Sequence, residues 1–220
     1  VKLSKIPLVK DIFTMIELLR FIGVKIKIDN NSKVIKLKNK KKIKTLAPYK
    51  LVKTMRAGVL VLGPLLTKYK KAKVSLPGGC AIGTRPVDLH LFALKRLGAK
   101  IKIKDGYIIA EAKKGLKGTK INFPSISVGA TENALLAAIE AEGKTVLSNC
   151  AIEPEIIDLI NFLQSGGANI KFIGKRTLRI EGVKNFKSTS YSVMPDRIET
   201  GTFCVAACLT GGNLKINNFD

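Results

Sequence analysis

Residues 16–28 read Ile16-Glu-Leu-Leu-Arg-Phe-Ile-Gly-Val-Lys-Ile-Lys-Ile28, and this stretch decides the fold because the chain repeats it. Similar stretches occur at residues 91–103 (LFALKRLGAKIKI) and 160–172 (INFLQSGGANIKF). In each stretch the apolar spacing before the glycine at the eighth position predicts an amphipathic helix, and the glycine predicts a left-handed C-cap. The alternation of polar and apolar residues that follows predicts a half-buried strand. We therefore expect three copies of a helix-glycine-strand unit, about 70 residues apart.

A repeat of this length indicates that one supersecondary module has been copied and that the copies pack around a shared interior. Further helices are expected over residues 49–65 and 130–141. This content favours an α/β architecture in which sheets enclose helices. A Rossmann fold is disfavoured because no Gly-x-Gly-x-x-Gly opens a helix after a strand.

The pattern changes after residue 193. Pro195-Asp-Arg-Ile-Glu-Thr-Gly-Thr202 is followed by a run of small apolar residues at 203–209, which predicts a helix, and then by a Gly-Gly turn and a final strand. These segments begin a new unit that the chain does not finish. We therefore expect residues 1–193 to form a repeat-built domain that is mostly present, and residues 194–220 to start a second domain.

The composition is that of a globular protein with its own core, because 46% of the 220 residues are hydrophobic. No stretch reaches the roughly 18–20 apolar residues of a membrane span, and no signal peptide is recognisable, so a cytoplasmic location is expected. The four cysteines have neither the dense spacing of a disulfide scaffold nor that of a zinc knuckle. We expect Cys204 and Cys208 to be packed in the interior rather than to bind a metal.

The formal net charge of +23 raises the question of a nucleic-acid or anionic-membrane partner. Only seven of the 39 basic residues are arginine, and the lysines are spread through every segment. A surface that binds nucleic acid would use more arginine and would interleave aromatic residues, which make up only 6% of the chain. We interpret the charge as a compositional bias and expect neither nucleic acid nor a membrane as partner.

Residues 75–90 (SLPGGCAIGTRPVDLH) place Cys80 among glycines, five positions before Arg85. Glycine lets the backbone approach a ligand closely, and the two prolines limit the ends of the flexible stretch. A thiol near a fixed positive charge becomes a usable nucleophile or proton donor near neutral pH. The alternative is a small apolar residue in a turn. The glycines favour a mobile loop that carries a reactive thiol.

Five stretches carry a resemblance to a known family: residues 47–57 (APYKLVKTMRA), 77–90, 127–133 (SVGATEN), 153–156 (EPEI) and 195–201 (PDRIETG). They resemble the UDP-N-acetylglucosamine 1-carboxyvinyltransferase family, the enolpyruvyl transferases of peptidoglycan precursor synthesis. The resemblance covers almost the whole chain, and the cysteine loop is its most specific part. It implies an inside-out α/β barrel of two domains, each built from three copies of a folding unit, with the substrates between the domains.

The implied reaction transfers the enolpyruvyl group of phosphoenolpyruvate to the 3-hydroxyl of UDP-N-acetylglucosamine and releases phosphate, without a metal or organic cofactor. The resemblance implies that Cys80 donates the proton, can form a covalent adduct with the enolpyruvyl carbon, and is alkylated by fosfomycin-type epoxides. Arg85 is implied to bind the phosphate or carboxylate, to which a planar guanidinium is suited. The implied substrate-binding residues are Arg56, Arg85, Pro86, Val87, Asp88, Leu89, His90, Ser125, Ser127, Val128 and Gly129.

Several of these residues have a structural alternative. Ser127 can cap a helix as well as bind a diphosphate. Arg56 is equally consistent with a buried ion pair, and His90 with packing at a helix start. Asp88 can cap the following helix, although we favour binding to uracil or sugar hydroxyls. Some family members have lysine in place of Ser125, so a cation toward the diphosphate is expected to be missing.

Two other functions remain open. The family's N-terminal Lys-Asn pair, its later aspartate and the arginines of its second domain have no counterpart here, so the chain could be a non-catalytic remnant that binds only nucleotide sugar. For the transferase as well, we expect a missing second domain to be needed to complete the site. The sister family, 3-phosphoshikimate 1-carboxyvinyltransferase, has a similar fold, but it lacks this cysteine loop.

Overall fold

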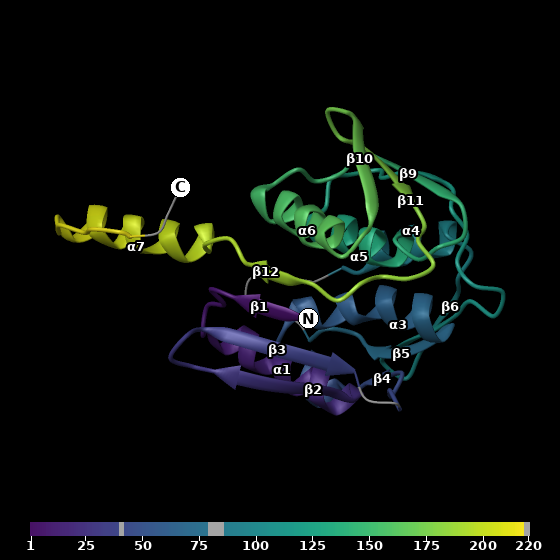
Figure 1. Cartoon of the computed structure of the whole chain (residues 1–220), viewed down its shortest axis with the longest axis horizontal. Helices are drawn as coiled ribbons and strands as arrows, with labels where there is room; N and C mark the ends of the chain where they lie inside the picture. The colour runs from purple at the N-terminus through teal and green to yellow at the C-terminus, as the bar shows by residue number, and fades with distance from the viewer. Residues whose placement is uncertain (40–41, 79–85, 218–220) are drawn as a thin grey trace.

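The computed structural model describes residues 1–39, 42–78 and 86–217. Its strands form three sheets of four strands each (Figure 1). In every sheet the first two strands run parallel and the remaining neighbours run antiparallel. The strands, in their order across each sheet, are β12 (Ser190–Ser192), β1 (Lys2–Ser4), β3 (Val34–Asn39) and β2 (Val24–Asp29); β4 (Leu46–Ala47), β5 (Lys71–Ser75), β7 (Tyr107–Glu111) and β6 (Lys100–Lys104); and β8 (Lys120–Asn122), β9 (Lys144–Ser148), β11 (Thr177–Glu181) and β10 (Asn169–Gly174).

The predicted helix-glycine-strand repeat is confirmed in all three copies. In each copy a helix, a glycine and two strands follow one another along the chain, and the two strands pair as an antiparallel hairpin of one sheet. Gly23, Gly98 and Gly167 have φ values of 120°, 100° and 97°, which lie in the region that favours glycine. The helices are α1 (Lys10–Ile22), α4 (Asp88–Arg96) and α6 (Pro154–Ser165).

The helix predicted over residues 49–65 is wrong as one continuous element. It is divided into α2 (Tyr49–Val52), the 3-10 helix η1 (Arg56–Val61) and α3 (Leu62–Tyr69). Met55 has an extended backbone, with φ −136° and ψ 115°, which interrupts the helical hydrogen bonds. Pro64 has no N–H to donate, so it fits only the first turn of a new helix. The other predicted inner helix is α5, which spans Val128–Ala138.

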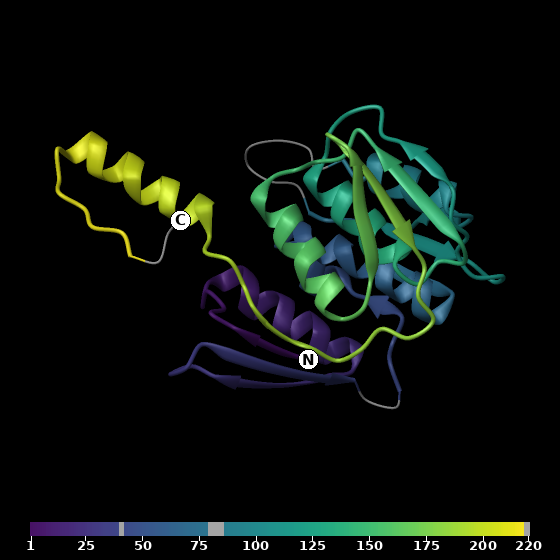
Figure 2. The ribbon, with the colours of Figure 1, turned by 45° about the horizontal axis from the view of Figure 1, so that its top comes forward.

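All helices except the C-terminal one lie inside the ring of sheets (Figures 1 and 2). Helix α5 is central, because it packs against η1, α3, α4 and α6. Its inner face is made of small and medium residues such as Ala134, Leu135 and Ala138, all fully or almost fully buried. The predicted architecture, with sheets outside and helices inside, is confirmed.

The C-terminal segment returns to the start of the chain. β12 pairs in parallel with β1, with Lys2 opposite Ser190, and so completes the first sheet in the position that β4 and β8 occupy in the other two. Beyond it, α7 (Arg197–Thr210) extends away from the sheets, and none of its residues is buried (Figure 2). This arrangement supports a boundary between two domains near residue 193, and that boundary stays a prediction.

Three expectations for this segment are wrong. The helix begins at Arg197 rather than at residue 203, since Asp196 caps it by accepting from the Ile198 and Glu199 amides. No strand forms over residues 213–217, where no neighbouring strand offers a ladder partner. Cys204 and Cys208 are exposed, not packed in the interior, because α7 extends away from the sheets and buries none of its residues.

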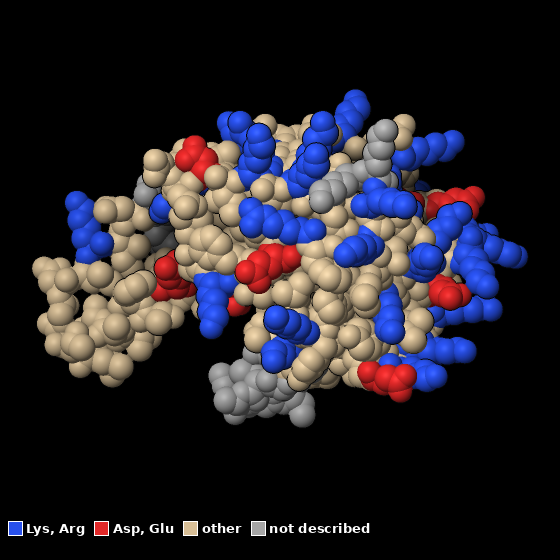
Figure 3. Space-filling model, turned by 90° about the horizontal axis from the view of Figure 1, so that it is seen from below, with Lys and Arg blue, Asp and Glu red and all other residues tan. Residues whose placement is uncertain are grey.

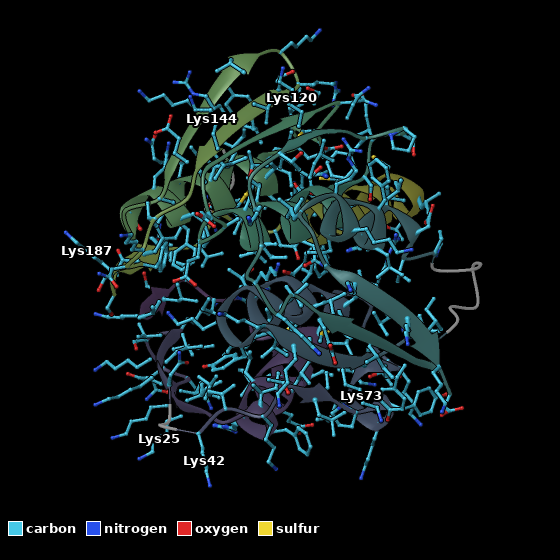
Figure 4. The ribbon with its side chains drawn as sticks, turned by 90° about the vertical axis from the view of Figure 1, so that its right-hand side faces the viewer. Lys25, Lys42, Lys73, Lys120, Lys144 and Lys187 are labelled. Atoms are coloured by element: carbon cyan, nitrogen blue, oxygen red, sulfur yellow. The ribbon has the colours of Figure 1, made fainter. Side chains whose placement is uncertain are left out.

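Basic side chains cover the outer faces of the sheets. In the first sheet Lys25 lies opposite Lys38, and Lys27 lies opposite Lys36. Figure 4 shows Lys25 and Lys187 at the periphery of the molecule. On the face seen in Figure 3 the basic groups are dispersed, with acidic groups among them, as the even distribution of lysine in the sequence predicts.

None of the helices in the described ranges has the length and apolar content needed to cross a membrane.

Candidate substrate-binding site

The start of α5 is held by side chains of its own first turn. Ser127 is the N-cap residue, and its Oγ accepts from the Ala130 amide at 3.3 Å. The Thr131 hydroxyl donates to the Ser127 carbonyl oxygen at 2.8 Å and accepts from the Ala151 amide at 3.1 Å. The capping role predicted for Ser127 is therefore confirmed, and it leaves the amides of Val128 and Gly129 at the helix start with no hydrogen bond to the described residues.

His90 on α4 lies directly against this helix start. Its side chain is only 2% exposed, and its Nδ1 is 3.2 Å from Nδ2 of Asn133. A methyl group added to Gly129 would lie 3.1 Å from Cε1 and 3.3 Å from Nε2 of the imidazole, so the absence of a side chain at Gly129 permits this approach. Two motifs that are far apart in the sequence thus meet at one point.

Burial lowers the pKa of His90 from 6.5 to about 4. The positive charge of Arg56 adds to this effect, and the Asp88 carboxylate opposes it. The imidazole is therefore neutral at physiological pH, and it offers one N–H donor rather than a charge.

The other predicted site residues within the described ranges lie on η1, on α4 or in the segments that precede α4 and α5. Arg56, at the start of η1, is exposed, so the alternative of a buried ion pair is wrong. Asp88 is exposed in the first turn of α4, and the N-cap position belongs to Val87, which provides no side-chain cap. Pro86 and Ser125 are exposed, Leu89 is half-buried, and Val87 is buried. Cys80 and Arg85 lie outside the described residues.

The sequence model of the EPSP synthase (3-phosphoshikimate 1-carboxyvinyltransferase) family matches residues 1–220. The chain belongs to this family. Among curated proteins, the chain is 63% identical over 220 residues to the UDP-N-acetylglucosamine 1-carboxyvinyltransferase of Pelagibacter ubique, covering 100% of this chain and 52% of that protein. It is 55% identical over 217 residues to UDP-N-acetylglucosamine 1-carboxyvinyltransferase 1 of Caldanaerobacter subterraneus, covering 98% and 51%. The chain thus spans about half the length of these relatives.

Solved structures share the family fold. The enolpyruvyl transferase NikO from Streptomyces tendae superposes with a TM-score of 0.79 at 23% identity, over 94% of this chain and 49% of that one. An EPSP synthase from Acinetobacter baumannii gives 0.72 at 19% identity, over 94% and 47%. The resemblance stated from the motifs is confirmed, and so is the enolpyruvyl transferase fold.

Sequence reasoning missed two side chains of α5. Asn133 is completely buried; its Oδ1 accepts from the Gly63 amide at 2.9 Å and its Nδ2 donates to the Val59 carbonyl at 3.2 Å. Glu132 is half-buried. Burial raises its pKa from 4.5 to about 7, and the negative charge of the Glu155 carboxylate is a second, smaller cause. The signals in the sequence are their place in the motif 127–133 and in a run of three polar residues, 131–133, at the start of an otherwise apolar segment. Their partners lie on other helices, which the sequence does not indicate.

Across the described ranges, no group of three or more His, Cys, Asp and Glu side chains is arranged to hold a metal ion.

Proposed function

We propose that the protein to which this chain contributes transfers the enolpyruvyl group of phosphoenolpyruvate to the 3-hydroxyl of UDP-N-acetylglucosamine, with release of phosphate, in the cytoplasm. The observation that carries the proposal is the 63% identity to a UDP-N-acetylglucosamine 1-carboxyvinyltransferase along all 220 residues. Because the chain spans 52% of that relative, we propose that a second domain completes the site.

Within this chain, the start of α5 is the proposed subsite for the diphosphate of the nucleotide sugar. Helix N-termini favour anions because their first amides are unpaired and the helix dipole is positive there. The juxtaposition of His90 and Gly129 supports this assignment, because it adds a buried donor beside those amides. Arg56 and the stretch from Arg85 to Leu89 are proposed to contact the remainder of the substrates.

The proposed chemistry balances without a redox step. Cys80 gives its proton to the methylene carbon of phosphoenolpyruvate, the sugar hydroxyl attacks the adjacent cationic carbon, and the hydroxyl proton is lost to a base. The C–O bond to phosphate then breaks, and the enolpyruvyl double bond is restored as a proton leaves the methyl carbon. Arg85 is proposed to bind the phosphate as a two-point oxyanion partner.

The decisive experiment is a chimera in which this chain replaces the matching residues of the Pelagibacter ubique relative. We expect phosphate release from phosphoenolpyruvate that requires UDP-N-acetylglucosamine and is abolished by Cys80→Ala. Cys204→Ala is the matched control, since Cys204 lies on the exposed face of α7. Release that survives Cys80→Ala would remove Cys80 from the mechanism.

The same chimera separates the two alternatives. Turnover of shikimate 3-phosphate in place of the nucleotide sugar would identify the sister activity. Binding of UDP-N-acetylglucosamine without phosphate release, in a chimera that is folded, would identify a non-catalytic remnant. The 220-residue chain alone is expected to bind the nucleotide sugar and to release no phosphate.

A further inference from the structure

The side-chain amide of Asn133 is oriented by two backbone groups. The Gly63 N–H donates to Oδ1 at 2.9 Å, and Nδ2 donates to the Val59 carbonyl oxygen at 3.2 Å. A backbone N–H can only donate and a carbonyl oxygen can only accept. Exchanging the amide oxygen and nitrogen of Asn133 would therefore break both hydrogen bonds, so the amide has one orientation.

This orientation fixes the tautomer of His90. The Nδ2 group of Asn133 is also 3.2 Å from Nδ1 of His90, and it has a second hydrogen to donate. Nδ1 must accept this hydrogen and so carries no proton. Because burial and Arg56 keep the imidazole neutral, its single proton is on Nε2.

The Nε2 atom is a buried donor with no hydrogen-bond partner among the described residues. It lies beside Gly129, at the helix start where the Val128 and Gly129 amides also have no partner within the described part of the chain. Buried donors without partners are rare in native proteins and indicate a missing acceptor. Three N–H groups from two helices are thus available at one place.

We propose that Asn133 is a positioning residue, which holds His90 as the Nε2–H tautomer so that the imidazole adds a neutral third donor, beside the Val128 and Gly129 amides, for a phosphate-type anion at the start of α5. The inference rests on the proposed function, because it takes the diphosphate of the nucleotide sugar as that anion. Asn133 itself lies one helical turn further along α5 and acts only through His90.

The first test needs no variant, because His90 is the only histidine of the chain. The nitrogen-15 NMR spectrum of the histidine-labelled chain at neutral pH reports which ring nitrogen carries the proton. We expect an unprotonated Nδ1 and a protonated Nε2. Addition of UDP should shift Nε2 and its proton more than Nδ1, and uridine, which lacks phosphate, should not. Nδ1 protonation in the free chain would overturn the proposal.

The second test uses Asn133→Ala, with circular dichroism to verify folding. We expect a mixture of the two tautomers and UDP binding about tenfold weaker, as for the loss of one oriented hydrogen bond. Asn169→Ala is the matched control, because Asn169 is exposed on β10 and its side chain donates to the Glu181 carboxylate at the surface. A folded Asn133→Ala variant that keeps one tautomer and normal UDP affinity would overturn the positioning role.

Different outcomes would overturn the role of Asn133, the anion site and the proposed function. An Nε2–H tautomer in a chain that does not bind UDP would overturn the anion site at the start of α5, whereas the proposed function is decided by phosphate release in the chimera. An Nδ1–H tautomer in a chain that binds UDP normally would overturn the role of Asn133 and leave the proposed function intact. If Asn133→Ala does not fold, the tautomer and the UDP titration of the unaltered chain decide the question.

Discussion

Arg197 and Glu155 form a two-point ion pair that joins the start of α7 to the start of α6. The Arg197 Nε donates to Oε2 of Glu155 at 3.0 Å, and Nη2 donates to Oε1 at 2.8 Å. This hydrogen bonding holds the pKa of the Glu155 carboxyl below its usual range. In the described part of the chain, it is the one ion pair between α7 and residues 1–193.

We expect Arg197→Ala to loosen the start of α7 without unfolding the rest of the molecule, since no residue of α7 is buried. Hydrogen exchange at the amides of residues 194–200 should accelerate, and exchange in α5 should stay the same. Arg197→Lys keeps the charge but loses the planar fork, so its exchange should be intermediate. Unchanged exchange in Arg197→Ala would mean that the ion pair does not hold α7.

Glu132 is predicted to make the protein less stable as the pH rises. Its pKa is about 7 in the folded chain and 4.5 as a reference, so the folded state binds more protons between these values. The free energy of unfolding therefore falls as pH rises from 4.5 to 7. Glu132→Gln removes this cost, and we expect a variant more stable by roughly 1–3 kcal/mol at pH 8 and nearly unchanged at pH 4.5.

Urea unfolding of wild type and Glu132→Gln from pH 4.5 to pH 8 measures this difference. The exposed Glu142→Gln is the matched control for the loss of one negative charge. A stability difference that does not grow with pH would show that Glu132 is ionised in the folded state at the lower end of the range.

His90 has the opposite effect on how the free energy of unfolding changes with pH. Its pKa is about 4 in the folded chain against 6.5 as a reference, so the unfolded state binds more protons between these values. This contribution to stability is complete above pH 6.5 and is lost as the pH falls toward 4. Glu132 acts in the opposite direction over an overlapping pH range. We therefore expect the loss of stability with falling pH to be steepest in a Glu132→Gln background.

The NMR titration of the single histidine gives the folded-state pKa directly. We expect Arg56→Ala to raise it, because the Arg56 charge lowers it, yet to leave it below 6.5, because burial is the larger cause. Arg56→Lys should change it less, since the positive charge is kept. A pKa near 6.5 in the unaltered chain would contradict the buried, neutral imidazole.

The parts of the fold that depend on local patterns could be predicted from the sequence. Helix, glycine and hairpin occur within one stretch, so all three repeats and the cap at Ser127 were expected correctly. The pairing of β12 with β1 could not be predicted, because each strand has three residues and they come from opposite ends of the chain. The exposure of α7 also escaped prediction, since its apolar run is typical of a packed helix.

The candidate site was predicted only as separate motifs. The resemblance indicates His90 and Gly129, but their contact depends on the packing of α4 against α5, which no sequence spacing encodes. Asn133 was missed for the same reason, because its partners Val59 and Gly63 lie on η1 and α3. Long-range contacts between helices therefore set the chemistry that the motifs alone leave open.

The cysteines of the described residues are predicted to differ sharply in reactivity. Burial raises the pKa of Cys150 to about 12, and its side chain is fully buried, whereas Cys204 and Cys208 are exposed on α7. Native iodoacetamide labelling followed by mass spectrometry should modify Cys204 and Cys208, and should modify Cys150 only after denaturation. Labelling of Cys150 in the native chain at the same rate would show that the interior around α5 opens readily.

Two helical glycines provide a matched test of the packing between α3 and α5. A Cβ at Gly63 would lie 2.5 Å from Oδ1 and 2.8 Å from the backbone oxygen of Asn133, whereas a Cβ at Gly201 meets nothing within 4 Å. Because α5 cannot move its backbone without disturbing α4 and α6, Gly63→Ala is expected to cost about 1–3 kcal/mol of unfolding free energy. Gly201→Ala should be neutral or stabilise α7 by up to about 1 kcal/mol, the helix preference of alanine over glycine. Urea unfolding measures both changes in stability. The nitrogen-15 NMR spectrum of the His90 imidazole should also change in Gly63→Ala, because the displaced Asn133 amide would no longer donate to His90. An unaltered spectrum would show that the packing of α3 does not control the orientation of the imidazole.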